Sequence, residues 1–176
     1  NLGGITGGGG EPLLDRVALG RAEESEGGGV IDKEEVIILI AEDDDGHAEL
    51  IDENLREAGL LNPRIRFRDG EEAWSFFEGK RPGERMEKGR PYLLLLDIRM
   101  PRMDGLELLR KIKKNKELET LPIIVLTTTD DPREIEECYR EGCNFYITKP
   151  IDFGRFTETL KRLGLFVKVI RVPPVR

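Results

Sequence analysis

The sequence predicts an α/β fold in which helices cover both faces of a parallel sheet. From Glu35 onward, apolar runs of strand length alternate with segments in which apolar residues recur at helical spacing. Runs such as Val36 to Ala41 and Leu93 to Leu96 are continuously apolar, which is typical of strands that helices bury on both sides. Together these observations indicate a doubly wound sheet of five strands and five helices.

The first elements follow from this pattern in chain order. A strand is expected over 36–41 and a helix over 46–58, where apolar residues recur every three or four positions. The next run, 64–68, alternates polar and apolar residues, which favours an edge strand. A helix over 71–78 then carries the only tryptophan, Trp74.

The later elements alternate in the same way. In the helix over 106–115, Leu106, Leu109 and Ile112 are expected to face inward. The following helix begins at Asp130-Asp131-Pro132, because an acidic cap followed by proline is a helix start signal. The remaining elements are expected at 93–96 (strand), 122–126 (strand), 144–148 (strand) and 153–163 (helix).

The chain divides into three parts by composition. Residues 1–33 are rich in glycine and are predicted to be a flexible leader or linker, because such a segment gains too little from burial to offset its ordering entropy. Residues 34–165 form the predicted folded domain, and 166–176 form a tail with two open roles, a further strand or a contact in a homodimer. The connection 79–90 is longer than is usual in such folds.

Charge and composition exclude several classes of function. The net charge of −7 argues against binding DNA, since neutralising phosphates requires clustered lysine and arginine. No apolar run approaches 18 residues, so no membrane span is expected. Cys138 and Cys143 are the only cysteines and have no histidine near them in sequence, so the pair fits neither a zinc site nor a disulfide scaffold. We expect reduced thiols and a cytoplasmic protein.

Polar residues follow the apolar runs where the strands end. Asp97 follows Leu93 to Leu96, the pair Glu42-Asp43 follows the first strand, and Thr127 and Lys149 follow the fourth and fifth. In parallel sheets of this kind, ligands bind outside the carboxyl ends of the strands. Each residue alone also fits a turn, a helix cap or a strand end. In combination, acids, a hydroxyl and an ammonium group would hold a divalent cation beside a phosphoryl group.

The chain resembles the receiver domains of two-component response regulators over roughly residues 35–165. The resemblance rests on Glu42-Asp43, on Asp97 followed by Met-Pro-Arg-Met-Asp-Gly, on Thr127, and on Lys149-Pro150. It implies a flavodoxin-like sheet with strand order 2-1-3-4-5. It also implies that Asp97 accepts a phosphoryl group from a phosphohistidine of a sensor histidine kinase.

The same resemblance implies roles for the other residues. Mg²⁺ would be bound by Asp43, Asp97 and the backbone carbonyl of Arg99, with Glu42 acting through water. Lys149 would pair with the phosphoryl oxygens and Thr127 would hydrogen-bond to them. Tyr146 would be the aromatic switch residue that changes rotamer together with Thr127.

The function expected on this basis is that of a single-domain phosphoacceptor, not an enzyme, whose output is a phosphorylation-dependent surface for a downstream protein. The 79–90 loop, the strand ending in Val-Leu-Thr-Thr and the tail look like the regulators that serve phytochrome-type kinases. One alternative is a pseudo-receiver that binds partners without phosphorylation. A haloacid dehalogenase-type phosphohydrolase is the other, but Arg99 stands where its second aspartate is needed.

Overall fold

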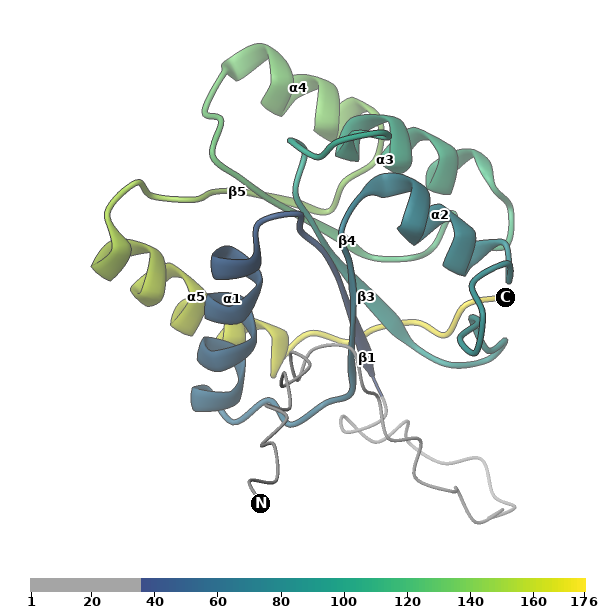
Figure 1. The fold of residues 1–176 in the computed structure, drawn as a ribbon, viewed down its shortest axis with the longest axis horizontal. Helices are drawn as coiled ribbons and strands as arrows, with labels where there is room; N and C mark the ends of the chain where they lie inside the picture. The colour runs from purple at the N-terminus through teal and green to yellow at the C-terminus, as the bar shows by residue number, and fades with distance from the viewer. Residues whose placement is uncertain (1–35) are drawn as a thin grey trace, which may run out of the picture.

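The computed structural model describes residues 36–176, so the leader expected over 1–33 lies outside the described residues. Within the described part, one five-stranded parallel sheet has the order β2-β1-β3-β4-β5 (Figure 1). The strands are β1 (Ile37–Ala41), β2 (Arg64–Phe67), β3 (Tyr92–Leu96), β4 (Ile123–Thr127) and β5 (Phe145–Thr148). The predicted fold class and strand order are confirmed.

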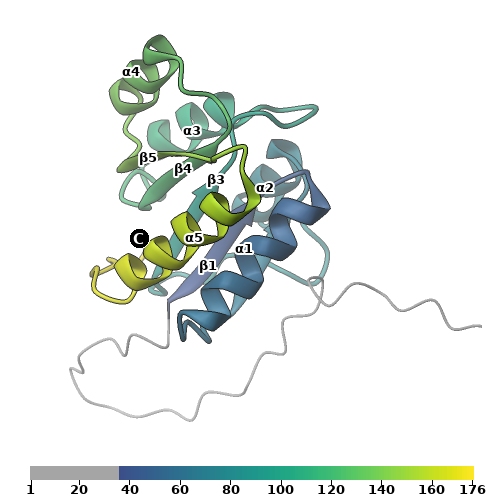
Figure 2. The ribbon, with the colours of Figure 1, turned by 90° about the vertical axis from the view of Figure 1, so that its left-hand side faces the viewer.

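Helices cover both faces of the sheet. Figure 2 shows α1 and α5 on one face, with α2, α3 and α4 on the other. The helices are α1 (Asp45–Glu57), α2 (Gly70–Phe77), α3 (Gly105–Lys114), α4 (Pro132–Arg140) and α5 (Phe153–Val167). Because strand side chains alternate, Ile38 and Ile40 enter the core beneath α1 and α5, whereas Leu39 enters the other core. Every residue of β1, β3 and β4 is buried, which explains their continuous apolar sequence.

An aspartate caps each of the five helices. In every case its side chain accepts a hydrogen bond from a backbone N–H in the first turn, at Asp44, Asp69, Asp104, Asp131 and Asp152. At α4 the cap is Asp131 and Pro132 is the first helical residue, as the sequence predicted. These caps fix where each helix starts relative to the strand that precedes it.

Two expectations about the helices change in detail. In α3, Leu109 and Ile112 are buried as expected and Leu106 is partly buried against the same core, but the fully buried Leu108 was not among the residues expected to face inward. Helix α5 continues to Val167, four residues past its expected end and into the segment assigned to the tail. The reason is that Leu163, Gly164 and Phe166 still pack against α1 and the sheet.

The C-terminal segment after Val167 forms no further strand, so the first of the two roles expected for the tail is wrong. It crosses the sheet from α5 to the loop after α2, as the yellow trace in Figure 1 shows. Near its end Pro174 forms an isolated antiparallel bridge with Pro91. Val175 is buried, and its backbone exchanges hydrogen bonds of 3.0 Å with Gly89 and Arg90. The segment thereby fastens the long 79–90 connection.

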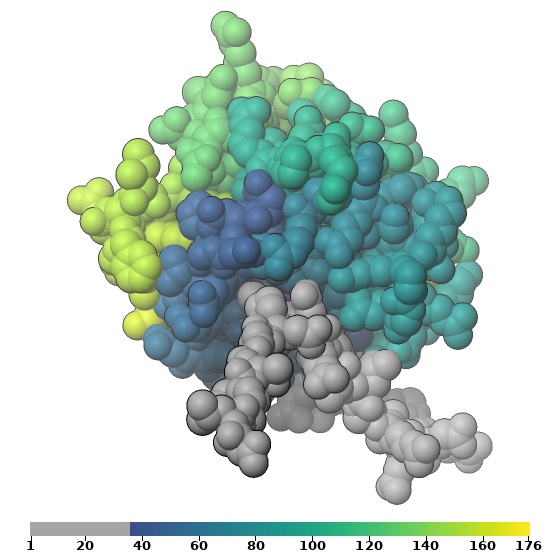
Figure 3. All heavy atoms as spheres, in the orientation of Figure 1, coloured from purple at the N-terminus to yellow at the C-terminus, as the bar shows by residue number. Residues whose placement is uncertain are grey.

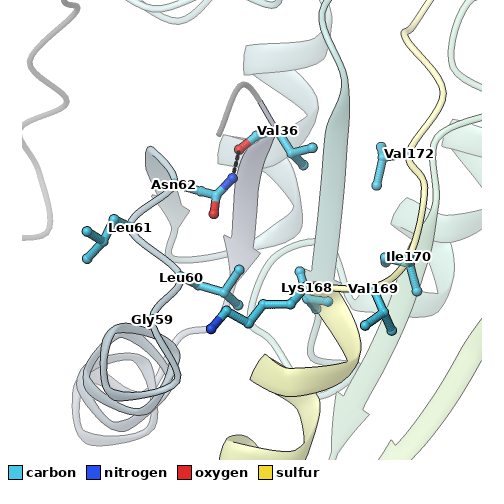
Figure 4. Close-up of a pocket in the computed structure, with 10 residues that line it drawn as sticks. Val36, Gly59, Leu60, Leu61, Asn62, Lys168, Val169, Ile170 and Val172 are labelled. Carbon is cyan, nitrogen blue, oxygen red and sulfur yellow. Dashed lines mark hydrogen bonds between the residues drawn. The ribbon is translucent and has the colours of Figure 1, made fainter. Parts of the chain in front are cut away.

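A groove lies at the end of the sheet away from the carboxyl ends of the strands. Its volume is about 610 Å³, and the loop after α1 and the C-terminal segment line it (Figure 4). Asn62 donates a 3.1 Å hydrogen bond across it to the carbonyl of Val36.

Among the described residues, no helix combines the length and the apolar character needed to cross a bilayer.

Candidate functional site

Three carboxylates meet at the carboxyl edge of β1 and β3. Ala41 and Leu96, the last residues of these strands, are paired in register, so the residues that follow them are neighbours. The backbone N–H of Asp97 donates to the carbonyl of Ala41 at 2.9 Å. Carboxylate oxygens of Glu42, Asp43 and Asp97 lie within 4.8 Å of one another. Glu42 and Asp97 are buried, whereas Asp43 is exposed.

Lys149 brings a buried ammonium group to the carboxylates. Its backbone N–H donates to the carbonyl of Thr127 at 2.6 Å, which fixes the residue directly after β5. Its side chain reaches across β4, where Nζ donates to Oδ2 of Asp97 at 3.0 Å and to Glu42. Burial raises the pKa of Glu42 to about 7, with Asp97 adding to the rise and Lys149 opposing it. One ammonium group thus lies among three carboxylates.

Thr127 ends β4 beside this cluster. Its side chain is fully buried, and in the described part of the chain its Oγ1 has no hydrogen-bond partner. A buried hydroxyl without a partner costs roughly 1 to 3 kcal/mol, so the position favours a ligand atom that accepts a hydrogen bond from it.

Arg99 and Tyr146 lie at the border of the site. The backbone N–H of Arg99 donates to Oδ1 of Asp97 at 3.2 Å, and its guanidinium donates to Glu134 at 2.6 Å. The hydroxyl of Tyr146 lies 3.0 Å from the carbonyl oxygen of Thr129, in the loop after β4. Tyr146 therefore contacts the loop that follows Thr127, outside the carboxylate cluster.

Arg66 is a residue that the sequence analysis missed. It lies in edge strand β2, yet its side chain is only 4% exposed. The guanidinium donates to the carbonyl of Glu42 through Nε at 3.1 Å and Nη2 at 3.0 Å, and to Asp45 at 2.6 Å. Arg66 thus holds the loop that presents Glu42 and Asp43. The only signal for it was a charged residue within a strand that pairs with β1.

His47, the only histidine, was also missed. It lies in the first turn of α1, four residues after Asp43. Its Nδ1 is 3.4 Å from Nζ of Lys149, and its ring packs edge-on against Phe156 of α5. Figure 3 shows the neighbouring surfaces of α1 (dark blue) and α5 (yellow-green).

Gly105 allows α3 to approach the end of β3, where Asp97 lies, closely. A Cβ at this position would lie 2.1 Å from the carbonyl oxygen of Asp97, so no other residue fits without a shift of the backbone. Its N–H donates to the carbonyl of Ile98 at 2.9 Å. The glycine that follows Met103-Asp104 is therefore part of what positions Asp97.

Comparison with known proteins identifies the family. A family model described as the response regulator receiver domain matches residues 38–161. The chain belongs to this family. The response regulator Rcp1 from Synechocystis is 35% identical over 102 residues, which are 58% of this chain and 68% of Rcp1. The predicted receiver domain of a two-component response regulator is confirmed.

Solved structures agree with this assignment. A receiver domain from Rhodospirillum rubrum has a TM-score of 0.75 and 43% identity, covering 80% of this chain and 99% of its own. The Mn²⁺-bound form of Rcp1 has a TM-score of 0.71 and 27% identity, covering 78% of this chain and 98% of Rcp1. The phosphorylated cyanobacterial phytochrome response regulator RcpA has a TM-score of 0.69 and 28% identity, covering 78% of this chain and 97% of RcpA.

Proposed function

We propose that this receiver domain accepts a phosphoryl group on Asp97 from a phosphohistidine of a sensor histidine kinase. The observation that carries the proposal is the convergence of three carboxylates, a buried ammonium and an unpartnered buried hydroxyl at one sheet edge. Membership of the family argues against the phosphohydrolase alternative. The resemblance to the phosphorylated receiver RcpA supports phosphorylation of this chain as well.

The proposed reaction forms one bond and breaks another. A carboxylate oxygen of Asp97 bonds to phosphorus, the P–N bond breaks, and its electron pair returns to the imidazole of the kinase. Both partners are anionic, so Lys149 reduces their repulsion and then pairs with the phosphoryl oxygens. Thr127 supplies a donor at the point where the new charge arrives.

We propose that Mg²⁺ is the metal of this site. Glu42, Asp43, Asp97 and the carbonyl of Arg99 are hard oxygen donors, which suit this ion, and Glu42 is proposed to act through water. Burial raises the pKa of Glu42 and the charge of Asp97 adds to the rise, and a divalent cation would relieve the repulsion within the cluster. When bound, the ion supplies positive charge beside the incoming phosphoryl group. The Mn²⁺-bound form of Rcp1 supports a divalent metal here.

We propose further that output occurs through a protein partner. The surface of α4, β5 and α5 lies next to Tyr146 and exposes Tyr139 and Phe145. Phosphorylation would change the population of conformers at this surface. A homodimer stays a prediction, to be tested by sedimentation of the full chain with and without phosphorylation.

Intact-mass analysis after incubation with acetyl phosphate and Mg²⁺ tests the function. We expect the gain of one phosphate, which EDTA and Asp97→Asn abolish. Asp130→Asn is the matched control, because Asp130 is an exposed acid outside the cluster. A folded protein that gains no phosphate from acetyl phosphate or from a phosphohistidine donor would instead be a pseudo-receiver.

A further inference from the structure

One carboxylate joins three elements at the border of the site. Glu134, in the first turn of α4, accepts a 2.6 Å hydrogen bond from the Arg99 guanidinium through Oε2. Its other oxygen, Oε1, lies 3.2 Å from the hydroxyl of Tyr146 in β5. The side chain of Glu134 is 13% exposed, whereas that of Arg99 is 64% exposed. The loop after β3, helix α4 and strand β5 thus meet at Glu134.

The tyrosine hydroxyl has a single proton and two acceptors within reach. These are Oε1 of Glu134 and, at 3.0 Å, the carbonyl oxygen of Thr129. Burial, together with the charge and the hydrogen bond of Glu134, raises the pKa of Tyr146, so the hydroxyl stays protonated and donates. Both acceptors lie on the same side, toward the loop after β4 and the start of α4.

Helix α4 carries other acids with different partners. Glu136 is exposed and pairs with Arg140 of the same helix at 3.1 Å. Glu137 pairs with Arg110 of α3. The first of these ion pairs lies within α4 and the second joins α4 to α3. Glu134 instead contacts two other elements, the loop after β3 through Arg99 and strand β5 through Tyr146.

We propose that Glu134 is a positioning residue that holds Tyr146 against the loop after β4, and that Arg99 couples this contact to the state of Asp97. The link to Asp97 is the N–H of Arg99, which donates to Oδ1 of the same carboxylate that would bear the phosphoryl group. A bond from that carboxylate to phosphorus changes this acceptor and therefore shifts the Arg99 loop. A shift of this loop also changes the ion pair between Arg99 and Glu134.

The coupling to Asp97 rests on the proposed phosphorylation, but the positioning of Tyr146 does not. The aromatic switch role expected of Tyr146 implies that its ring changes rotamer together with Thr127 when Asp97 is phosphorylated. Glu134 restricts the ring to the conformer that contacts the loop after Thr127, so fewer conformers compete with that contact. By reciprocity, whatever loosens Tyr146 must also make phosphorylation less favourable.

Fluorine NMR of the unphosphorylated full chain, labelled with 3-fluorotyrosine, tests the positioning. Tyr146→Phe assigns the resonance of Tyr146. We expect Glu134→Ala to shift or broaden it and Arg99→Gln to shift it in the same direction, while Glu136→Ala leaves it in place. An unmoved resonance in Glu134→Ala, or an equal shift in Glu136→Ala, would overturn the proposal. Glu134→Gln replaces Glu134→Ala if the latter does not fold, because an amide cannot keep the ion pair.

The rate of phosphorylation by phosphoramidate, measured by intact mass, tests the coupling. The rate falls in proportion to the population of conformers that hold Tyr146 against the loop after β4, so we expect Glu134→Ala to slow the reaction roughly fivefold, with an unchanged Mg²⁺ midpoint. Tyr146→Phe should slow it similarly, and the double variant no further. Additive effects or the wild-type rate would overturn the coupling. If the wild type takes up no phosphate, the proposed function fails, and the NMR result still decides the positioning.

Discussion

At the scale of single residues, Arg66 shows that the geometry of the candidate site depends on a side chain far from Asp97 in sequence. Its guanidinium satisfies the carbonyl of Glu42 and neutralises Asp45, and the burial of such a charge requires partners of this kind. A charged residue in an apparent edge strand could be read as solvent-exposed. Only the fold reveals that it faces the loop between β1 and α1.

We expect Arg66→Met to weaken Mg²⁺ binding about tenfold, in line with the loss of other residues that orient metal ligands. Methionine keeps the apolar stem but leaves the carbonyl of Glu42 without its donor. Isothermal titration calorimetry measures the affinity. The matched control is Arg68→Met, because Arg68 also bonds to Asp45 but does not contact the carbonyl of Glu42. Equal affinities in wild type and Arg66→Met would contradict this role.

The two thiols are expected to be unreactive in the folded protein. Burial raises the pKa of Cys138 to about 12 and that of Cys143 to about 11. The reactive thiolate is therefore scarce at pH 8, and we expect labelling by a disulfide reagent to be slow until the chain is unfolded in guanidinium. Fast labelling of the native protein would show that one of the thiols is accessible as the thiolate.

The raised pKa values of the two thiols also predict how the free energy of unfolding changes at alkaline pH. The unfolded thiols ionise above their ordinary pKa of 9.0, whereas the folded thiols keep their protons. The free energy of unfolding is therefore unaffected by these groups below that pH, and it falls as the pH rises toward 11. Urea titrations at pH 8 and 10 measure the difference, and Cys143→Ala should reduce it.

At the scale of elements, the close approach of α3 to β3 depends on Gly105. We expect Gly105→Ala to lower the free energy of unfolding by roughly 1 to 3 kcal/mol, because the added methyl would overlap the carbonyl of Asp97. Urea denaturation measures the change. Gly154→Ala is the control, since its Cβ would meet only Oδ1 of Asp152, at 3.4 Å. A Gly105→Ala protein as stable as that control would show that α3 can move away freely.

How far the elements could be predicted depends on what fixes each of them. Strands β1 and β3 and the start of α4 follow from local sequence, because continuous apolar runs and the Asp131-Pro132 cap act within a few residues. The end of α5 was missed, since packing against α1 extends the helix past its expected end.

The site divides in the same way. Residues that directly follow a strand could be located from the sequence, because the ends of parallel strands meet at one edge. Glu134 and Arg66 could not be assigned a role, since their partners come from elements distant in the chain. Nothing in a run of helix glutamates distinguishes Glu134 from Glu136 before the fold brings Tyr146 beside it.

At the scale of the whole molecule, the two ends of the sheet have separate tasks. The carboxyl edge holds the candidate site, and the C-terminal segment fastens the opposite end through Val175 and the 79–90 connection. Stability and chemistry should therefore respond separately to substitutions at the two ends.

We expect Val175→Ala to lower the free energy of unfolding by roughly 1 to 2 kcal/mol, the cost of removing two buried methyl groups. Val169→Ala, at a position that is 69% exposed on the same segment, should change it little. Urea denaturation measures both, and intact mass after acetyl phosphate treatment should give the wild-type extent of phosphorylation. A loss of phosphorylation in folded Val175→Ala would mean that the far end of the sheet communicates with Asp97, since the backbone of Val175 bonds to Gly89 and Arg90, in the connection before β3.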